Sequence, residues 1–290
     1  MRPVQASRLS ALLLAALLSA PASAQQFATP RASPSAKLTQ TVGTTDLTVT
    51  YSRPAVKGRV IWGGLVPWDQ PWRTGANEAT QFTCADEIMV EGQKLAAGTY
   101  ALVTIPTADS WTVIFSTQKD MWGSNGYDAK HDALRVTVKP VAAAHVERMQ
   151  FSFEDPGNDA VALNLRWEKL SVPVKITVDT NGKTLTAARA AVAAAKPDDW
   201  STPYRAANWA HGAGVAHEET AHWAQSAAKV KENFQTTGLL AKLAAQGGDS
   251  KKASELMKKS IALGKSDTTI VKEQIEANEK LLAEWSSKPK

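Results

Sequence analysis

The sequence predicts a mainly β protein with an α-helical tail: an antiparallel β-sandwich or jelly roll, followed by a small helix-turn-helix repeat region. Short runs of alternating apolar residues recur from Lys37 to Val178, separated by clusters of Gly, Pro, Asn and Asp. No helical period lies between these runs, and a parallel sheet would need crossover helices. From Trp200 to the end of the chain the apolar pattern is helical instead.

The first 24 residues resemble a secretory signal peptide. Arg2 and Arg8 precede an apolar run, Leu9 to Leu18, and small residues end at Ala24. That run is well short of the ~20 apolar residues that a membrane-spanning helix needs. We therefore expect cleavage after Ala24 and a soluble periplasmic or extracellular protein, without a lipid anchor because no cysteine lies near the cleavage site. Residues 25–35 contain two prolines and are expected to form a flexible leader.

Residues 36–180 are expected to form the β-sandwich, from nine or ten short strands. Leu47, Val49 and Tyr51 alternate with threonines and are predicted to pair with the strand Lys37–Val42 across a turn at Gly43. Similar alternation recurs at 88–90, 101–105, 111–115, 134–138, 149–153, 163–167 and 172–178.

The pattern changes near Asp179. Residues 181–199 are predicted to be a linker, with a turn at Asn181-Gly182 and an alanine-rich helix over Thr186–Lys196. Residues 200–290 are predicted to form the helical tail. Four pairs of similar residues stand 33 positions apart, near the ~34-residue period of a tetratricopeptide-type repeat: Gly214 and Gly247, Trp223 and Leu256, Ala228 and Ile261, Val230 and Leu263. An unrelated helical bundle is the alternative.

Charge and cysteine content exclude some classes of function. Without the signal peptide, 31 basic residues stand against 28 acidic ones, and they form no concentrated basic face of the kind that nucleic-acid binding requires. The single cysteine, Cys84, has no partner for an internal disulfide, and we expect it to be a small buried apolar residue.

The candidate site lies between the predicted second and third strands, where cationic and polar residues alternate with tryptophans. Arginines can hold a carboxylate or phosphate through paired hydrogen bonds, and tryptophan faces can stack on sugars or cations. The alternative is structural: an arginine–glutamate pair would fix an irregular loop while the tryptophans fill the end of the sandwich. The proposed ligand-binding residues are Arg53, Lys57, Arg59, Trp62, Trp68, Trp72, Arg73, Asn77 and Glu78, with Arg53, Arg73, Asn77 and Glu78 as the polar centre.

A polar loop downstream supplies secondary candidates: Trp122, Tyr127, Asp128 and His131. Because His131 has acidic neighbours, it is a candidate general base or metal ligand, and a solvated loop histidine is the alternative. His217 and His222 are five residues apart, whereas the zinc-protease motif needs a spacing of four. We therefore expect no metal site. Phosphate-binding, dinucleotide and nucleophile-elbow motifs are missing as well, and we expect no cofactor.

Several of these segments together resemble the bacterial domain-of-unknown-function family 2911. They are Tyr51-Ser-Arg-Pro54, Lys57-Gly-Arg59, Trp72-Arg-Thr-Gly-Ala-Asn-Glu-Ala-Thr80, Ala97-Gly-Thr-Tyr100 and Leu134-Arg-Val136. The resemblance runs from about residue 35 to residue 179. It implies secretion and a β-rich fold, and in some members a tetratricopeptide-like tail. It implies no activity and no catalytic residues.

Three hypotheses follow from the sequence. The leading one is a β-sandwich that binds a ligand, such as a small anion or sugar, or an envelope component, with a helical tail for interaction. The second is a hydrolase of envelope or extracellular polymers, with two of Glu78, Asp128, His131 and Asp132 as acid and base. The third is an interaction scaffold whose helical tail binds a protein partner.

Overall fold

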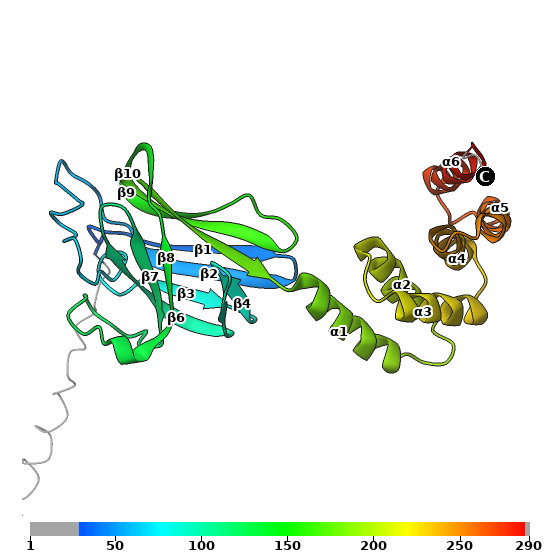
Figure 1. The fold of residues 1–290 in the computed structure, drawn as a ribbon, viewed down its shortest axis with the longest axis horizontal. Helices are drawn as coiled ribbons and strands as arrows, with labels where there is room; N and C mark the ends of the chain where they lie inside the picture. Colours follow the sequence, from blue (N-terminus) through cyan, green and yellow to red (C-terminus); the bar gives the residue numbers. More distant parts are fainter. Residues whose placement is uncertain (1–28, 288–290) are drawn as a thin grey trace, which may run out of the picture.

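The computed structural model describes residues 29–287, which form ten β-strands, one short 3-10 helix and six α-helices. Figure 1 shows the strands at one end of the molecule and the helices at the other. We call Ser35–Val178 the β region and Thr180–Ser287 the helical region. The predicted signal peptide and its cleavage after Ala24 lie outside the described residues, as does the start of the predicted leader.

The β region consists of two antiparallel sheets, as the alternating pattern predicts. The six-stranded sheet has the order β1-β2-β3-β6-β7-β8, and the four-stranded sheet has the order β5-β4-β10-β9. The strands are β1 (Ser35–Val42), β2 (Thr45–Ser52), β3 (Gln81–Cys84), β4 (Ile88–Val90), β5 (Gln93–Leu95), β6 (Gly98–Pro106), β7 (Trp111–Ser116), β8 (Asp132–Val138), β9 (Val141–Glu154) and β10 (Ala160–Val178). The 3-10 helix η1 (Ala129–His131) precedes β8.

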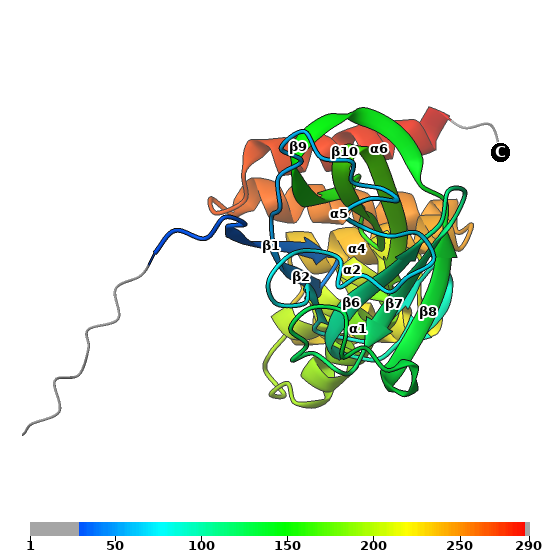
Figure 2. The ribbon, with the colours of Figure 1, turned by 90° about the vertical axis from the view of Figure 1, so that its left-hand side faces the viewer.

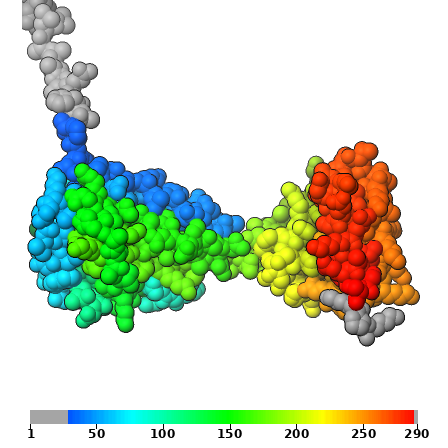
Figure 3. Space-filling view, turned by 90° about the horizontal axis from the view of Figure 1, so that it is seen from above, coloured from blue at the N-terminus to red at the C-terminus, as the bar shows by residue number. Residues whose placement is uncertain are grey.

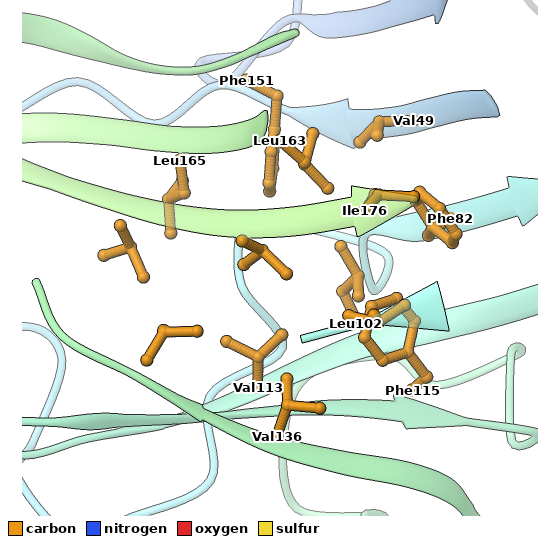
Figure 4. Packing of buried hydrophobic residues seen from close by; sticks show 14 of the residues in the cluster. Val49, Phe82, Leu102, Val113, Phe115, Val136, Phe151, Leu163, Leu165 and Ile176 are labelled. Carbon is orange, nitrogen blue, oxygen red and sulfur yellow. The ribbon is translucent and has the colours of Figure 1, made fainter. Parts of the chain in front are cut away.

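One apolar core lies between the two sheets. Figure 4 shows Phe82 and Leu102 of the six-stranded sheet packed with Ile176 of β10. Because side chains alternate across a strand, every second residue of each run faces this layer. Cys84 is buried in the same core, as predicted, and its thiol donates to the Ala96 carbonyl at 3.2 Å.

The longest strand, β10, folds back on itself. Glu168 has a positive φ of 54°, and the sheet register shifts on both sides of it. As a result, the Val178 amide donates to the Asp159 carbonyl at 2.8 Å, so the two ends of the strand lie side by side. The sequence pattern predicts two separate strands here. The bend brings Trp167, one residue before Glu168, to the end of the β region remote from the helices.

The helical region contains α1 (Thr180–Ala193), α2 (Ser201–Ala213), α3 (His217–Val230), α4 (Phe234–Gln246), α5 (Ser250–Ser266) and α6 (Lys272–Ser287). The predicted turn at Asn181-Gly182 is wrong, because both residues belong to the first turn of α1. The Asp179 side chain accepts a hydrogen bond from the Gly182 amide and so caps this helix. Asn-Gly is compatible with the first turn of a capped helix, where backbone N–H groups have no intrahelical partner.

The predicted 33-residue spacing falls on corresponding places of two helix pairs. Gly214 follows α2 and Gly247 follows α4, whereas Trp223 lies in α3 and Leu256 in α5. The repeat and its tetratricopeptide type stay predictions. Among residues 29–287, no helix is both long enough and apolar enough to cross a bilayer.

The β and helical regions meet through α1, and Figure 3 shows a narrow neck at this point. Lys183 of α1 forms an ion pair with Asp86, which also accepts from the Thr45 hydroxyl at 2.8 Å. The Thr180 hydroxyl donates to the Asn158 carbonyl at 2.5 Å. The turn between β1 and β2 lies against the same place, since a Cβ on Gly43 would overlap the Thr180 side chain.

We predict that Gly43→Ala lowers the free energy of unfolding more than Gly92→Ala does. Both glycines have positive φ, 57° and 79°, so each substitution carries the left-handed backbone penalty of roughly 1–2 kcal/mol. Only the Gly43 variant also overlaps Thr180, because nothing lies within 4 Å of a Cβ at Gly92. Urea unfolding of both variants measures the difference. Equal losses would show that the turn does not contact α1.

We also predict a pH-dependent stabilisation by the Asp86–Lys183 pair. Hydrogen bonding from Lys183 lowers the pKa of Asp86 below its usual range. A carboxylate with a lowered folded-state pKa stabilises the fold above its unfolded-state pKa of about 4, and this stabilisation disappears as the pH falls through the folded-state value. Asp86→Asn should therefore cost up to about 1 kcal/mol at neutral pH and nothing in strong acid. Asp46→Asn is the control, since Asp46 forms no ion pair among the described residues.

Candidate functional site

The candidate site is built on the irregular segment Arg53–Thr80, which joins β2 to β3 at the end of the β region remote from the helices (Figure 1). Its three prolines, at positions 54, 67 and 71, remove backbone donors and prevent a regular strand. Trp72 attaches the segment to β6: its amide donates to the Thr104 carbonyl at 2.7 Å, and the Thr104 amide donates back at 2.8 Å.

Four tryptophans pack together beneath this segment. Trp72 stacks on Trp167, with ring centroids 5.8 Å apart and planes 20° apart. Trp62 lies edge-on to Trp111 at 4.9 Å and to Trp167 at 5.7 Å. The indole nitrogens of Trp62, Trp111 and Trp167 are buried and find no acceptor among the described residues. The cluster therefore forms an apolar floor in which three of the four indole N–H groups have no hydrogen-bond acceptor among the described residues.

Above this floor lies a cavity of about 590 Å³. Two cations line it, Arg59 and Arg73, together with polar side chains and several prolines. None of its described lining residues carries a carboxylate. The full lining is Ser33, Pro54, Arg59, Leu65, Val66, Pro67, Gln70, Pro71, Trp72, Arg73, Gly75, Ala76, Ser124, Asn125 and Trp167. Figure 2 looks onto this end of the molecule.

Of the two cations that line the cavity, Arg73 has the fewer hydrogen-bond partners among the described residues. Its Nε is buried without a hydrogen-bond partner, and its guanidinium forms no ion pair within residues 29–287. Burial lowers the pKa of Arg73 from its usual value. Its backbone amide donates to the Ser124 hydroxyl at 3.1 Å, which ties it to the other loop that lines the cavity. A cation held in this way attracts an anion.

Arg59 is the second cation of the cavity. Its Nε donates to the Val56 carbonyl at 3.1 Å and its Nη2 to the Ala55 carbonyl at 2.5 Å. These carbonyls orient the guanidinium, but because they are uncharged they leave its positive charge in place. The cavity therefore presents two guanidinium groups without a counter-ion among its lining residues.

The backbone beside Arg73 is strained. Thr74 has a φ of 54°, and a β-branched residue in this conformation is an outlier. It is buried, and its hydroxyl donates to the Trp72 carbonyl and lies 3.2 Å from the Thr104 hydroxyl. Strained residues of this kind gather at functional sites, where the surrounding structure holds them.

The other predicted polar residues do not line this cavity. Arg53 donates to the Met149 carbonyl at 3.0 Å, and Asn77 donates to the Ser33 carbonyl and the Ser52 hydroxyl. Glu78 pairs with Arg31 at 2.8 Å rather than with an arginine of the segment. The predicted polar centre of four residues therefore keeps only Arg73 in the cavity.

The remaining members of the predicted set take structural or peripheral positions. Trp62 belongs to the tryptophan cluster, where it fills the end of the sandwich as the structural alternative predicts. Lys57 is exposed, and its amide donates to the Glu147 carboxylate at 2.9 Å. Trp68 is 36% exposed and packs beside Gly63 at the surface.

The secondary candidates do not line the cavity either. Trp122 is 71% exposed, and its backbone pairs with Glu78. Tyr127 donates to Asp132 at 2.8 Å, and burial is the main cause that raises its pKa. His131 is half-buried before β8. From this loop only Ser124 and Asn125 reach the cavity.

The carboxylates of the hydrolase hypothesis each hold a cation. Glu78 pairs with Arg31, Asp128 with Lys130 at 2.6 Å, and Asp132 with Arg135 at 2.5 Å. Within residues 29–287 no two of them share a hydrogen bond. The described residues also contain no group of three or more His, Cys, Asp and Glu placed to hold a metal ion.

Trp167, Gln70, Ser124 and Asn125 are among the cavity residues that sequence reasoning missed. Trp167 stands in an alternating strand pattern, which indicates only that it is buried. Its position beside Trp72 depends on the bend in β10. Ser124 and Asn125 lie inside a loop that the sequence singles out for its aromatic and charged residues, and no local signal marks them.

Other hollows lie in the described part of the chain, among them one of about 730 Å³ between Asp86 and α1. A cleft of about 980 Å³ lies where the turns of the β region meet α1 and α2, lined by Asp159, Asp179 and Trp209 among others. A groove of about 220 Å³ lies on α2, α4 and α6, where Tyr204, Lys242 and Asn278 line it. The cleft is wider than the arginine cavity, but its Asp179 already caps α1 and no cation lines it.

The fold and this geometry define a class: a two-sheet β domain with an arginine-lined cavity at one end and a helical region at the other. The profile of the family "Protein of unknown function (DUF2911)" matches residues 33–176, as the sequence resemblance predicts. This part of the chain belongs to that family, and the match covers the whole irregular segment and both arginines. No curated protein and no solved structure matches the chain.

We predict that Arg73→Met leaves the free energy of unfolding unchanged or raises it by up to about 1 kcal/mol. The substitution removes a partly buried charge that has no ion-pair partner among the described residues, and it keeps most of the side-chain volume. Arg135→Met is the contrasting variant, since it leaves Asp132 without its cation and should cost about 1 kcal/mol or more. Chemical unfolding measures both. A loss at Arg73 as large as that at Arg135 would assign Arg73 a structural role.

Proposed function

We propose that the β region binds a small molecule that carries a carboxylate or phosphate group, in the cavity lined by Arg59 and Arg73. The observation that carries this proposal is the pair of guanidinium groups lining a cavity to which no carboxylate of residues 29–287 contributes. Guanidinium groups match carboxylate and phosphate oxygens through paired, charge-assisted hydrogen bonds. A bound anion would supply the acceptor that the buried Nε of Arg73 lacks among the described residues.

The walls of the cavity favour an organic anion over an inorganic ion. The volume of about 590 Å³ falls in the range of roughly 300–1,000 Å³ typical of small-molecule sites. Trp72 and Trp167, although almost fully buried, contribute apolar lining together with Leu65 and three prolines, against which an apolar group of a ligand can pack. Gln70, Ser124 and Asn125 add neutral polar groups that can orient hydroxyls.

The N-terminal sequence supports a site of action outside the cytoplasm. Its charged, apolar and small-residue segments are those of an exported protein. We infer a periplasmic or extracellular binding protein, whose helical region lies at the opposite end from the cavity (Figure 1). This separation leaves the cavity mouth clear of the helices.

The test is a thermal-shift and calorimetry screen of small carboxylates, sugar acids and organic phosphates against the chain from Gln25. A specific ligand at a hundredfold excess over its Kd should stabilise the fold by about 2.7 kcal/mol. We expect Arg73→Met to weaken binding roughly ten- to hundredfold, because charge-assisted hydrogen bonds are lost. Arg73→Lys should recover part of the affinity, since it restores the charge without the planar fork.

Arg166→Met is the matched control for this screen. Arg166 is also half-buried and its Nε also lacks a partner in the described part of the chain, but it does not line the cavity. Ligand binding should be unchanged in this variant. Equal losses at Arg73 and Arg166, or binding that persists in Arg73→Met, would contradict the proposed site.

A further inference from the structure

Exposed apolar side chains concentrate around the cavity mouth. Five large apolar residues of the β region are exposed among the described residues, and four of them lie in the two loops that border the cavity. We call these four the apolar rim: Val60 (73% exposed), Leu65 (46%), Trp68 (36%) and Trp122 (71%). Such a gathering is uncommon on the surface of a monomeric soluble protein and marks an interaction site.

The rim adjoins the cavity through Leu65 and through the loop that carries Trp122. Leu65 belongs to both, since it lines the cavity and is half exposed. Trp122 stands two residues before Ser124, which lines the cavity and accepts from the Arg73 amide. An occupant of the cavity mouth therefore meets apolar side chains on the outside and guanidinium groups inside.

Charge on the Lys57–Arg73 part of this surface is mainly positive. The segment from Lys57 to Arg73 contains three cations and one carboxylate, that of Asp69. Glu78, next along the chain, is paired with Arg31. A partner that complements the whole surface carries negative charge close to an apolar layer, and the headgroup region of an anionic bilayer has this chemistry. Tryptophan side chains are also enriched at the level of lipid headgroups.

We propose that the apolar rim docks on the surface of an anionic lipid bilayer, with a lipid phosphate seated in the cavity against Arg73. This inference rests on the proposed function and specifies its ligand as a phospholipid headgroup within a membrane. The remote position of the helical region, seen in Figure 1, leaves this end free to approach a flat surface. The helices would then face away from the membrane.

The experiment is flotation of the chain from Gln25 with two kinds of vesicle: phosphatidylcholine alone, and phosphatidylcholine mixed with phosphatidylglycerol. Starting at Gln25 removes no described element and excludes binding through the apolar run of the first 24 residues. We expect binding to the anionic vesicles only, weakened by salt. Trp122→Ser and Leu65→Ser should each weaken it roughly tenfold, which corresponds to about 60 Å² of inserted apolar surface. Arg73→Met should weaken it about fivefold.

Val271→Ser is the matched control, because Val271 is 54% exposed at the start of α6, far along the chain from the rim. It should bind vesicles as the unmodified chain does. Absence of vesicle binding, or binding that neither rim variant weakens, would overturn the inference.

Free glycerol phosphate, tested by calorimetry without vesicles, separates this inference from the proposed function. If it binds in an Arg73-dependent manner while vesicles do not, the cavity is a site for a free anion and the membrane inference is rejected. If neither vesicles nor any anion of the screen binds, both proposals fail. Vesicle binding that depends on the rim and on Arg73 supports both.

Discussion

The site depends on one constraint, the two-way backbone pairing between Trp72 and Thr104. It attaches a proline-rich segment, which cannot form a strand, to the rigid six-stranded sheet. The pairing places the indole of Trp72 on Trp167 and directs the next residue, Arg73, into the cavity. Thr74 accepts an unfavourable backbone conformation in the process. The backbone pairing with the sheet thus offsets the energetic cost of the strained segment that shapes the site.

The positive charge of the cavity stays uncompensated because its described lining residues, the two arginines apart, are uncharged. Of the tryptophans that line the cavity, Trp72 donates its indole N–H to the Gly75 carbonyl and Trp167 finds no acceptor among the described residues, so neither ring supplies negative charge. Water at the mouth and an incoming ligand are the remaining sources of compensation. A protein selected only for stability would replace such a cation by an apolar residue of similar size. The charge of Arg73 differs from that of Arg166 in that it lines the cavity, where a ligand can reach it.

The two regions divide the molecule into ends with different surfaces. At one end are the cavity and the apolar rim; at the other are helices with many charged residues, such as Lys258 and Glu284, on their exposed faces. Lys183 and Asp86 join the regions near the neck, together with contacts from the β1–β2 turn. The two ends are separate surfaces (Figure 3), so ligand binding at one end would not block protein contacts at the other.

The sequence by itself determined the antiparallel strands, the change to helices after Asp179 and the family of residues 33–176. Apolar and polar residues alternate with a period of two in any half-buried strand, so strands can be recognised from the local sequence. It also indicated Arg59, Trp72 and Arg73. Only the tertiary structure decided which charges meet: Glu78 pairs with Arg31, 47 residues earlier, and leaves Arg73 without a partner among the described residues. It also brought Trp167 and Ser124 to the cavity, because a strand bend and a loop crossing join residues that no sequence period connects.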